Sequence, residues 1–178
     1  MGMYAALLRG VNVGGHNRLS GECLRGVAEA VGLERVRTYL QSGNVVFAAA
    51  GAAPETLAQA LEARVGEALG LRVRVFVRTA HDVASIVAAN PFLEAAGDGR
   101  QLHVTFLARE PAPERLAELP TGWGADVLRA HGREVYLFCP GGYGETRFNG
   151  RSLERVLGVE TTTRNWNTVR ALEAMLAV

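Results

Sequence analysis

The sequence predicts an α+β protein made of two split βαβ units in one chain, the second of them degenerate and followed by an extra C-terminal helix. Two observations predict this class. Apolar residues recur at helical spacing in some segments and alternate with other residues elsewhere, and the segments of the first half follow the order βαββαβ. A similar but incomplete order recurs in the second half. We therefore expect one unit over residues 1–79 and a connecting helix plus a second unit over residues 80–178.

The first half opens with a strand, a helix and a hairpin. The apolar run Tyr4–Leu8 precedes a glycine-rich turn and is typical of a buried strand. Ser20 can cap a helix whose apolar residues stand at helical spacing up to Gly32. Two β-rich runs then flank the turn at residues 42–44 and predict a hairpin.

A second helix and a fourth strand complete the first half. Pro54 stands at the first position of a helix that Gly70 closes. Val73, Val75 and Val77 alternate with arginine and phenylalanine, so they predict a strand with one apolar and one basic face. The resulting order, βαββαβ, is that of the ferredoxin-like unit.

The second half repeats this order with one element changed. Thr79 and Asp82 form a capping box before a connecting helix. The elements expected after it are a strand over Leu102–Ala108, a helical turn over Glu114–Leu119, a hairpin turning at His131-Gly132, a helix ended by Gly158 and a final helix carrying Val169, Leu172 and Leu176. That final helix stands where the βαββαβ order requires a strand, which makes the second unit degenerate.

Composition places the chain among ordinary globular proteins. Hydrophobic residues make up 48% and charged residues 21% of the 178 residues. The sequence has no apolar run of the roughly 18 residues that cross a bilayer and no secretory signal, so we expect a cytoplasmic protein without membrane contact. Its 19 basic and 18 acidic residues leave a net charge of +1, which argues against binding nucleic acid or anionic lipid by overall charge.

Residue types and spacing exclude several kinds of chemistry. Every basic residue other than the histidines is arginine, so neither a Schiff-base lysine nor a Walker lysine can exist. The cysteines Cys23 and Cys139 stand in apolar stretches and are expected to be reduced, buried thiols. The four histidines lack metal-ligand spacing, so we expect no metal site and no cofactor. A Ser42 nucleophile would need His16 as its base, and whether the protein is an enzyme stays open.

The predicted topology brings two separated segments to one edge of the first sheet. The crossover rule places the end of the first strand, the start of the first helix and the hairpin turn together, so residues 9–20 should face residues 41–44. Free N–H groups at a helix N-terminus favour an anion, Arg9 or Arg18 can add a charge-assisted contact to it, and amide side chains can add neutral hydrogen bonds. The candidate ligand-binding residues of this edge are Arg9, Asn12, Gly14, Gly15, Gln41, Ser42 and Asn44. The alternative is that the glycines only turn the chain and that Asn12 only tolerates a left-handed conformation.

A second polar cluster precedes the last helix. The segment at residues 161–168 combines three threonines with arginine, tryptophan and two asparagines. One hypothesis is a pocket lined by Arg164, Asn165 and Asn167 with Trp166 as its wall. The alternative is structural: Thr163, Asn165 or Asn167 caps the last helix, and Trp166 packs beside it.

The basic face of the fourth strand suggests a different partner. Arg72, Arg74, Phe76 and Arg78 alternate with the valines of that strand. Arginines beside an aromatic residue on a sheet face are typical of platforms for single-stranded RNA. The alternative is a solvated face, or an edge strand protected by its charge.

Three segments carry motifs that are specific when taken together. They are Tyr4–Gly15 (YAALLRGVNVGG), Thr38–Phe47 (TYLQSGNVVF) and Thr162–Val169 (TTRNWNTV), which span nearly the whole chain. On these segments the chain resembles the bacterial family known as domain of unknown function 1697. The resemblance implies an α+β fold with a duplicated ferredoxin-like arrangement, and it implies no particular activity, substrate or catalytic residue. His16 stands where we expect a lysine in relatives, which weakens any model that needs a permanent cation there.

Three hypotheses of function follow from these residues. The first is binding of a small anionic or phosphorylated ligand at the edge formed by residues 9–20 and 41–44. The second is a module for single-stranded nucleic acid that uses the basic strand face. The third is a homo-oligomeric interaction scaffold without catalysis.

Overall fold

The computed structural model describes residues 1–41 and 43–177 of the chain. Contacts within these residues divide the chain into two compact units, one formed by Met1–Ser85 with the residues from Ala171 onward and the other by Ile86–Arg170. The chain leaves the first unit within helix α3 (Ala80–Ala88) and returns to it within helix α6 (Trp166–Leu176). The domain boundary expected after residue 79 stays a prediction. No helix in the described part of the chain is both long and apolar enough to cross a membrane.

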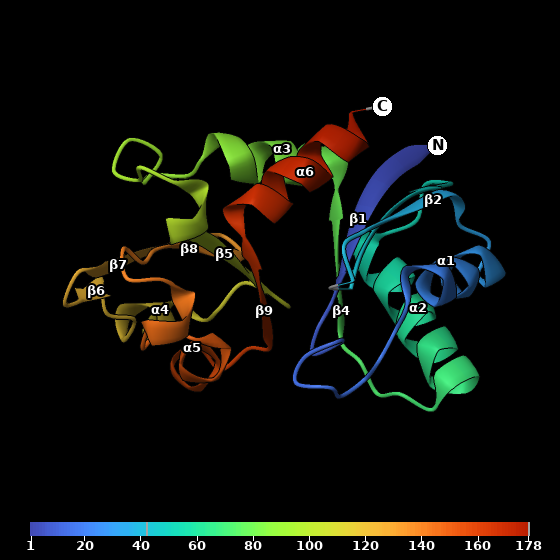
Figure 1. Ribbon diagram of the computed structural model, residues 1–178, viewed down its shortest axis with the longest axis horizontal. Coiled ribbons are helices and arrows are strands. Elements are labelled where there is room, and N and C mark those ends of the chain that lie inside the picture. The colour runs from blue at the N-terminus through green and yellow to red at the C-terminus, as the bar shows by residue number, and fades with distance from the viewer. Residues whose placement is uncertain (42, 178) are drawn as a thin grey trace. The chain divides into compact units, whose positions relative to one another are not determined.

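The first unit is an antiparallel sheet of four strands with two helices on one face (Figure 1). Strand β1 lies between β3 and β4, and β2 is the edge strand next to β3. In chain order the elements are β1 (Gly2–Leu8), α1 (Gly21–Ala30), β2 (Glu34–Tyr39), β3 (Asn44–Ala49), α2 (Pro54–Leu69) and β4 (Val75–Thr79). This order confirms the six elements that the sequence predicts for the first half.

The predicted helix ends are confirmed in their chemistry as well as in their position. The Ser20 hydroxyl accepts a hydrogen bond from the N–H of Cys23 at 3.1 Å, which caps α1. Pro54 is the first residue of α2, and Gly70 ends that helix in the left-handed conformation. Thr79 and Asp82 exchange the two reciprocal hydrogen bonds of a capping box at the start of α3.

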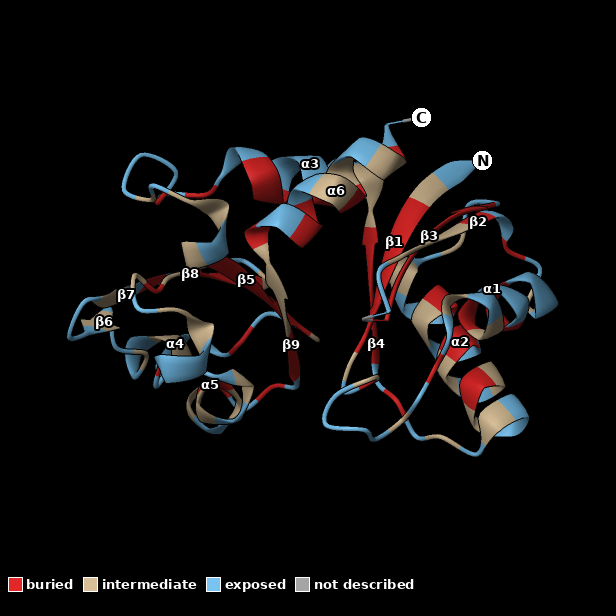
Figure 2. Cartoon of the chain, in the orientation of Figure 1, coloured by how far each residue is buried: buried red, intermediate tan, exposed pale blue. Residues whose placement is uncertain are grey.

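The core of the first unit lies between its sheet and the helices α1 and α2. Strand residues of alternate positions supply one half of this core, and the apolar stripes of the two helices supply the other. Figure 2 shows that buried residues also continue along the strands of this sheet. All six residues of β3 are buried, as expected for a strand whose two faces are both covered.

The second unit is an antiparallel sheet in the order β6-β7-β8-β5-β9. Helices α4 and α5 cover one face of it, where Leu153 and Leu157 of α5 pack on strand residues such as Leu137. In chain order the elements are α3, η1 (Gly99–Gln101), β5 (Leu102–Leu107), α4 (Pro113–Ala117), β6 (Gly122–Trp123), β7 (Asp126–His131), β8 (Glu134–Phe138), η2 (Tyr143–Glu145), α5 (Gly150–Leu157), β9 (Thr161–Asn165) and α6.

One prediction for the second half is wrong. The segment Thr161–Asn165 is strand β9, which pairs with β5, so the sixth element is a strand and the final helix follows it. The sequence hides this strand because it is short and polar and lies at the sheet edge, where three threonines and an arginine replace the usual alternation of apolar residues. The expected helix does begin directly after it, at Trp166.

The hairpin turn of the first unit requires glycine at residue 43. Gly43 has a φ of 70°, and a Cβ added there would lie 2.3 Å from the Cγ2 of Val11. We expect Gly43→Ala to lower the free energy of unfolding by about 2–4 kcal/mol, because a left-handed alanine and an overpacked contact each cost energy. Gly26→Ala is the matched control: it adds a Cβ inside α1 with open space around it and should raise stability by about 0.5–1 kcal/mol. Urea unfolding of both variants measures the difference, and equal effects would contradict it.

Candidate functional site

The two segments that topology was expected to bring together do meet at one edge of the first sheet. The N–H of Leu8, at the end of β1, donates to the carbonyl of Gly43 in the hairpin turn at 2.8 Å. The side-chain amide of Asn12 donates to the carbonyl of Gln41 at 2.6 Å. The loop after β1 and the β2–β3 turn are therefore joined by direct hydrogen bonds.

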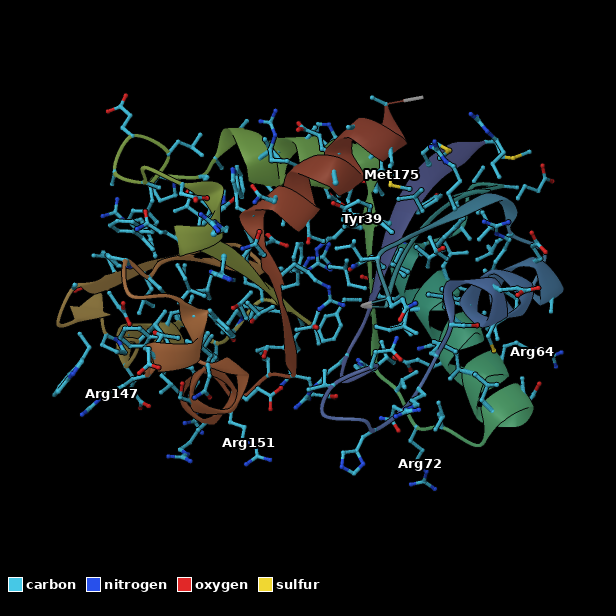
Figure 3. All side chains as sticks on the ribbon, viewed as in Figure 1. Tyr39, Arg64, Arg72, Arg147, Arg151 and Met175 are labelled. Atoms are coloured by element: carbon cyan, nitrogen blue, oxygen red, sulfur yellow. The ribbon has the colours of Figure 1, made fainter. Side chains whose placement is uncertain are left out.

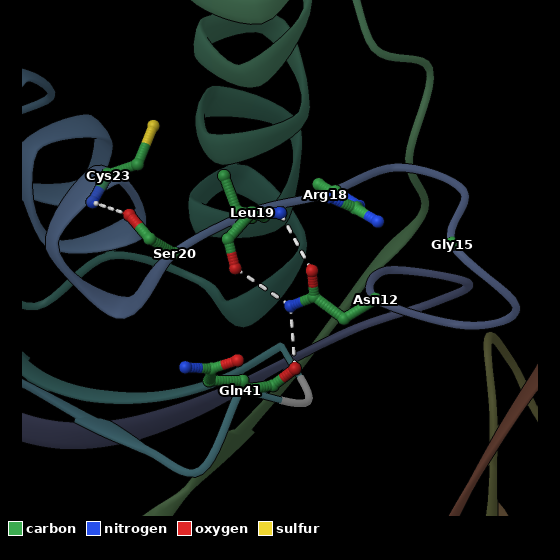
Figure 4. A pocket seen from close by; sticks show the side chains of 7 residues that line it. All are labelled: Asn12, Gly15, Arg18, Leu19, Ser20, Cys23 and Gln41. Atoms are coloured by element: carbon green, nitrogen blue, oxygen red, sulfur yellow. Dashed lines mark hydrogen bonds between the residues drawn. The ribbon is translucent and has the colours of Figure 1, made fainter.

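Asn12 uses its whole side-chain amide to hold this edge together (Figure 4). Besides the bond to Gln41, its Nδ2 donates to the carbonyl of Leu19 at 2.7 Å, and its Oδ1 accepts from the N–H of Leu19 at 2.8 Å. Its φ of 55° is left-handed, a conformation that asparagine tolerates better than most residues. Asn12 therefore serves as a positioning residue, and both hydrogens of its amide group are committed to backbone carbonyls.

The loop between Asn12 and Leu19 folds back on itself. The N–H of Asn12 donates to the carbonyl of Asn17, and the N–H of His16 donates to that of Val13. Asn17 is also left-handed, and its amide group donates to the carbonyl of Gly10 at 3.1 Å. These bonds fix the path of the loop at its two asparagines.

A pocket of about 580 Å³ lies where this loop, the start of α1 and the hairpin turn meet. The residues that line it are Asn12, Gly15, Arg18, Leu19, Ser20, Cys23 and Gln41 (Figure 4). Arg18 is exposed and makes no hydrogen bond or ion pair with any other described residue. The pocket thus combines a solvent-facing guanidinium group, an exposed amide side chain and the amino end of a helix.

Three further residues predicted for this edge, Arg9, Gly14 and Asn44, lie outside the lining. Arg9 is partly buried, and its N–H donates to the carbonyl of Arg74. Gly14 is exposed in the loop, with a φ of 58°. Asn44 is fully buried, and its amide group donates to the carbonyl of Tyr39 at 3.3 Å, so it supports the hairpin from inside. Ser42 lies outside the described residues.

The second predicted cluster, Arg164 to Asn167, lies in the other unit, where strand β9 passes into α6. The Asn165 side chain accepts a hydrogen bond from the N–H of Asn167 at 2.9 Å, and Trp166 is buried. Arg164 donates to the hydroxyl of Thr162 and to the carbonyl of Thr163, and burial lowers its pKa to about 10. These contacts are those of a helix cap and a packed strand end.

The spacing of the histidines in the sequence does not single out His103, which is a buried titratable group of the second unit. Its side chain is 8% exposed, its Nδ1 has no hydrogen-bond partner in the described structure, and its ring stacks on Tyr143 at 4.7 Å. Burial lowers the pKa of this imidazole and raises that of the Tyr143 phenol. The sequence gives no sign of this buried environment. It arises from the pairing of β5 with its neighbouring strands and from the stacked ring of Tyr143.

The sequence predicted that the fourth strand presents an open, basic face to RNA. This prediction is wrong, because the face is not open. Strand β4 begins at Val75, so Arg72 and Arg74 precede it, and Arg74 pairs with Glu62 of α2 at 3.4 Å. Phe76 and Arg78 are each only 3% exposed. Bases cannot stack on a buried ring, so Phe76 does not offer the stacking surface that this hypothesis requires, and nucleic-acid binding as such stays a prediction.

Within the described part of the chain, both cysteines are free thiols and no cluster of metal-ligating side chains is found. Cys23 is partly buried and Cys139 is buried, and both are free thiols. Burial raises the pKa of the Cys139 thiol, which keeps it protonated. Within residues 1–41 and 43–177, no group of three or more histidine, cysteine, aspartate or glutamate side chains could hold a metal ion.

Removing the Asn12 side chain tests its role at the candidate edge. We expect Asn12→Gly to lower the free energy of unfolding by about 2–3 kcal/mol, because it deletes three hydrogen bonds while glycine keeps the left-handed backbone. Asn17→Gly is the control, since Asn17 is also left-handed but its side chain donates a hydrogen bond to the carbonyl of Gly10 alone among the described residues, and it should cost less than about 1 kcal/mol. Equal costs in chemical denaturation would contradict this role for Asn12.

The buried imidazole predicts a pH dependence of stability. Because the folded pKa of His103 lies below its ordinary value of 6.5, the unfolded chain binds the proton more readily. The free energy of unfolding should therefore fall as the pH drops below about 6.5. His103→Gln should flatten this slope, because it removes the group whose pKa differs between the folded and the unfolded chain. Denaturation of the wild type and of this variant between about pH 7.5 and 5 measures the slopes, and an unaltered slope in His103→Gln would refute the assignment.

Comparisons with other proteins agree with the fold described above. The conserved bacterial protein SP0830 from Streptococcus pneumoniae has a solved structure that superposes with a TM-score of 0.76 at 21% sequence identity, covering 98% of each chain. A search of curated proteins found no match to the chain. The family model described as "Protein of unknown function (DUF1697)" matches residues 1–136. The chain therefore belongs to the DUF1697 family.

Proposed function

We propose that the protein binds a small anionic or phosphorylated ligand in the pocket between the loop after β1, the start of α1 and the β2–β3 turn. The observation that supports this most is the composition of the pocket: the exposed Arg18 and the amino end of α1 line the same space of about 580 Å³. A space of this size accommodates a small metabolite.

The electrostatics of the pocket favour negative charge. The first N–H groups of a helix have no partner within it, and the helix dipole places partial positive charge at that end. Ser20 takes up the N–H of Cys23, and the ten-residue helix α1 carries this positive end beside Arg18. A phosphate or carboxylate in this position would receive charge-assisted hydrogen bonds from the guanidinium group.

Neutral groups would then orient the ligand. The side chain of Gln41 is exposed and lines the pocket, while its backbone carbonyl is held by Asn12. Gly15 lines the pocket without a side chain, so a ligand can approach the backbone there. In this proposal Arg18 and Gln41 bind the ligand, and Asn12 keeps the two segments in register.

We further infer that both units are ferredoxin-like copies of one ancestral unit. The sheet order β2-β3-β1-β4 in the first unit corresponds to β7-β8-β5-β9 in the second, with β6 as an addition. Arg78 of β4 and Arg164 of β9 also correspond: each stands opposite the middle of the central strand, and each donates to the carbonyl of its preceding residue. Two copies of one unit explain both similarities.

The binding proposal predicts a specific loss on changing Arg18. A ligand present at a concentration of about 100 times its Kd stabilises the folded protein by ~2.7 kcal/mol. We expect Arg18→Ala to weaken binding at least about tenfold. This loss of affinity removes ~1.4 kcal/mol of the stabilisation. The control is Arg72→Ala, because Arg72 is exposed and points away from the ribbon (Figure 3). The measurement is a thermal-shift screen with inorganic phosphate and a panel of phosphorylated and carboxylated metabolites, followed by calorimetry. If no compound shifts the wild-type midpoint, or if Arg18→Ala responds like Arg72→Ala, the proposal is wrong.

A further inference from the structure

Strand β7 of the second unit is covered along only part of its outer edge. The two-residue strand β6 pairs Gly122 with Val127 and Trp123 with Asp126. Beyond this pair, the N–H of Leu128 donates to the carbonyl of Thr121 at 3.0 Å. No other described segment pairs with the remaining residues of β7 on this side.

The register of the β7–β8 hairpin determines which backbone groups face that open edge. Residues 132 and 133 form the turn, with Gly132 at a φ of 58°, and His131 and Glu134 are the closing pair. In an antiparallel ladder the closing pair of such a turn exchanges hydrogen bonds, and the next pair does not. Ala130 belongs to that next pair, so its N–H and C=O point away from β8, on the same side as the N–H of Leu128.

A small pocket lies directly beside these outward groups. Its volume is about 300 Å³, enough for one or two apolar side chains. The residues that line it are Leu116, Leu119, Pro120, Thr121, Leu128, Arg129, Ala130 and Gly132. An open strand edge next to an apolar pocket has both features that an added strand needs, since main-chain hydrogen bonds supply affinity and the pocket accepts alternate side chains.

The charge along this edge distinguishes between possible occupants. Arg129 is exposed, lines the pocket and makes no hydrogen bond or ion pair with other described residues. If a second copy paired with this edge antiparallel about Ala130, Arg129 of one chain would face His131 of the other, so the pairing would bring no carboxylate to this guanidinium group. A strand that carries carboxylates opposite Arg129 has the complementary charge.

We propose that the outer edge of β7 from Leu128 to Gly132 is a docking site for an extended peptide segment of another protein, with alternating acidic and apolar residues, that adds a strand to the sheet. The apolar side chains of the peptide enter the pocket beside Leu116 and Leu119, and its carboxylates lie near Arg129. This surface belongs to the second unit and is independent of the anion pocket proposed above.

An eight-residue synthetic peptide that alternates valine and glutamate tests this surface, with a valine–lysine peptide as its charge control. Amide hydrogen exchange should slow about tenfold at Ala130 when the glutamate peptide is added, because the outward N–H gains a hydrogen bond. Ala130→Pro removes that N–H without removing a bond to β8 and should abolish binding, whereas Ala130→Val keeps the N–H and should bind. Arg129→Glu should reverse the preference between the two peptides, by about tenfold for each.

Thermal unfolding of each variant shows whether the fold is retained, and the Arg129→Glu comparison applies even if Ala130→Pro fails to fold. Three results would overturn the proposal: no change at Ala130 with the glutamate peptide up to about 1 mM, the highest Kd of useful affinity; no effect of charge reversal at Arg129; or a homodimer in light scattering that Ala130→Pro disperses. The last result would assign the edge to a second copy of this chain.

Discussion

The hydrogen bonds of the Asn12 side chain are the contacts on which the candidate site depends. One planar amide group bonds the start of the loop after β1 to the end of the same loop at Leu19 and to the hairpin turn at Gln41. Each of these bonds contributes only about 1 kcal/mol, yet they share one rigid group, so the loop and the turn hold a fixed spacing. Asn12, Leu19 and Gln41, which these bonds join, all line the pocket.

Burial on both faces of the first sheet is the second constraint, and it changes the meaning of the arginine-rich strand. An alternating strand on a one-sided sheet would expose every second residue. Here Phe76 and Arg78 occupy such alternate positions and are nevertheless buried. In the second unit, Arg164 of β9 is partly buried and has a lowered pKa. Arginine at these positions is part of the packed structure, and its side chain reaches back to the neighbouring main chain.

Two exposed arginines line pockets elsewhere in the structure. Arg18 lies beside a helix start, and Arg129 lies beside an open strand edge, and both line pockets. The near-zero net charge of the chain means that neither place relies on overall attraction. Ligand recognition at either place would depend on one guanidinium group and on the backbone groups beside it, those of the start of α1 near Arg18 and those of the edge of β7 near Arg129.

The sequence by itself determined the elements of the first unit and the meeting of residues 9–20 with residues 41–44. Ser20, Pro54 and Gly70 mark helix ends through chemistry that acts within a few residues, and the crossover rule then fixes which loops share an edge. Local signals failed at β9, because a polar strand at a sheet edge is recognised by its pairing with β5 and not by its own pattern.

Only the tertiary structure decided which polar residues are available to a ligand. Asn12, Asn44 and Arg18 look alike as donors in the sequence, but the first is committed to backbone carbonyls, the second is buried in the hairpin and the third faces a pocket. The buried Nδ1 of His103, which has no hydrogen-bond partner in the described structure, likewise results from strand β5 and the short helix η2, whose stacked rings are 40 residues apart in the sequence. Burial and hydrogen-bond partners arise from contacts between distant segments, so no local pattern of residues can encode them.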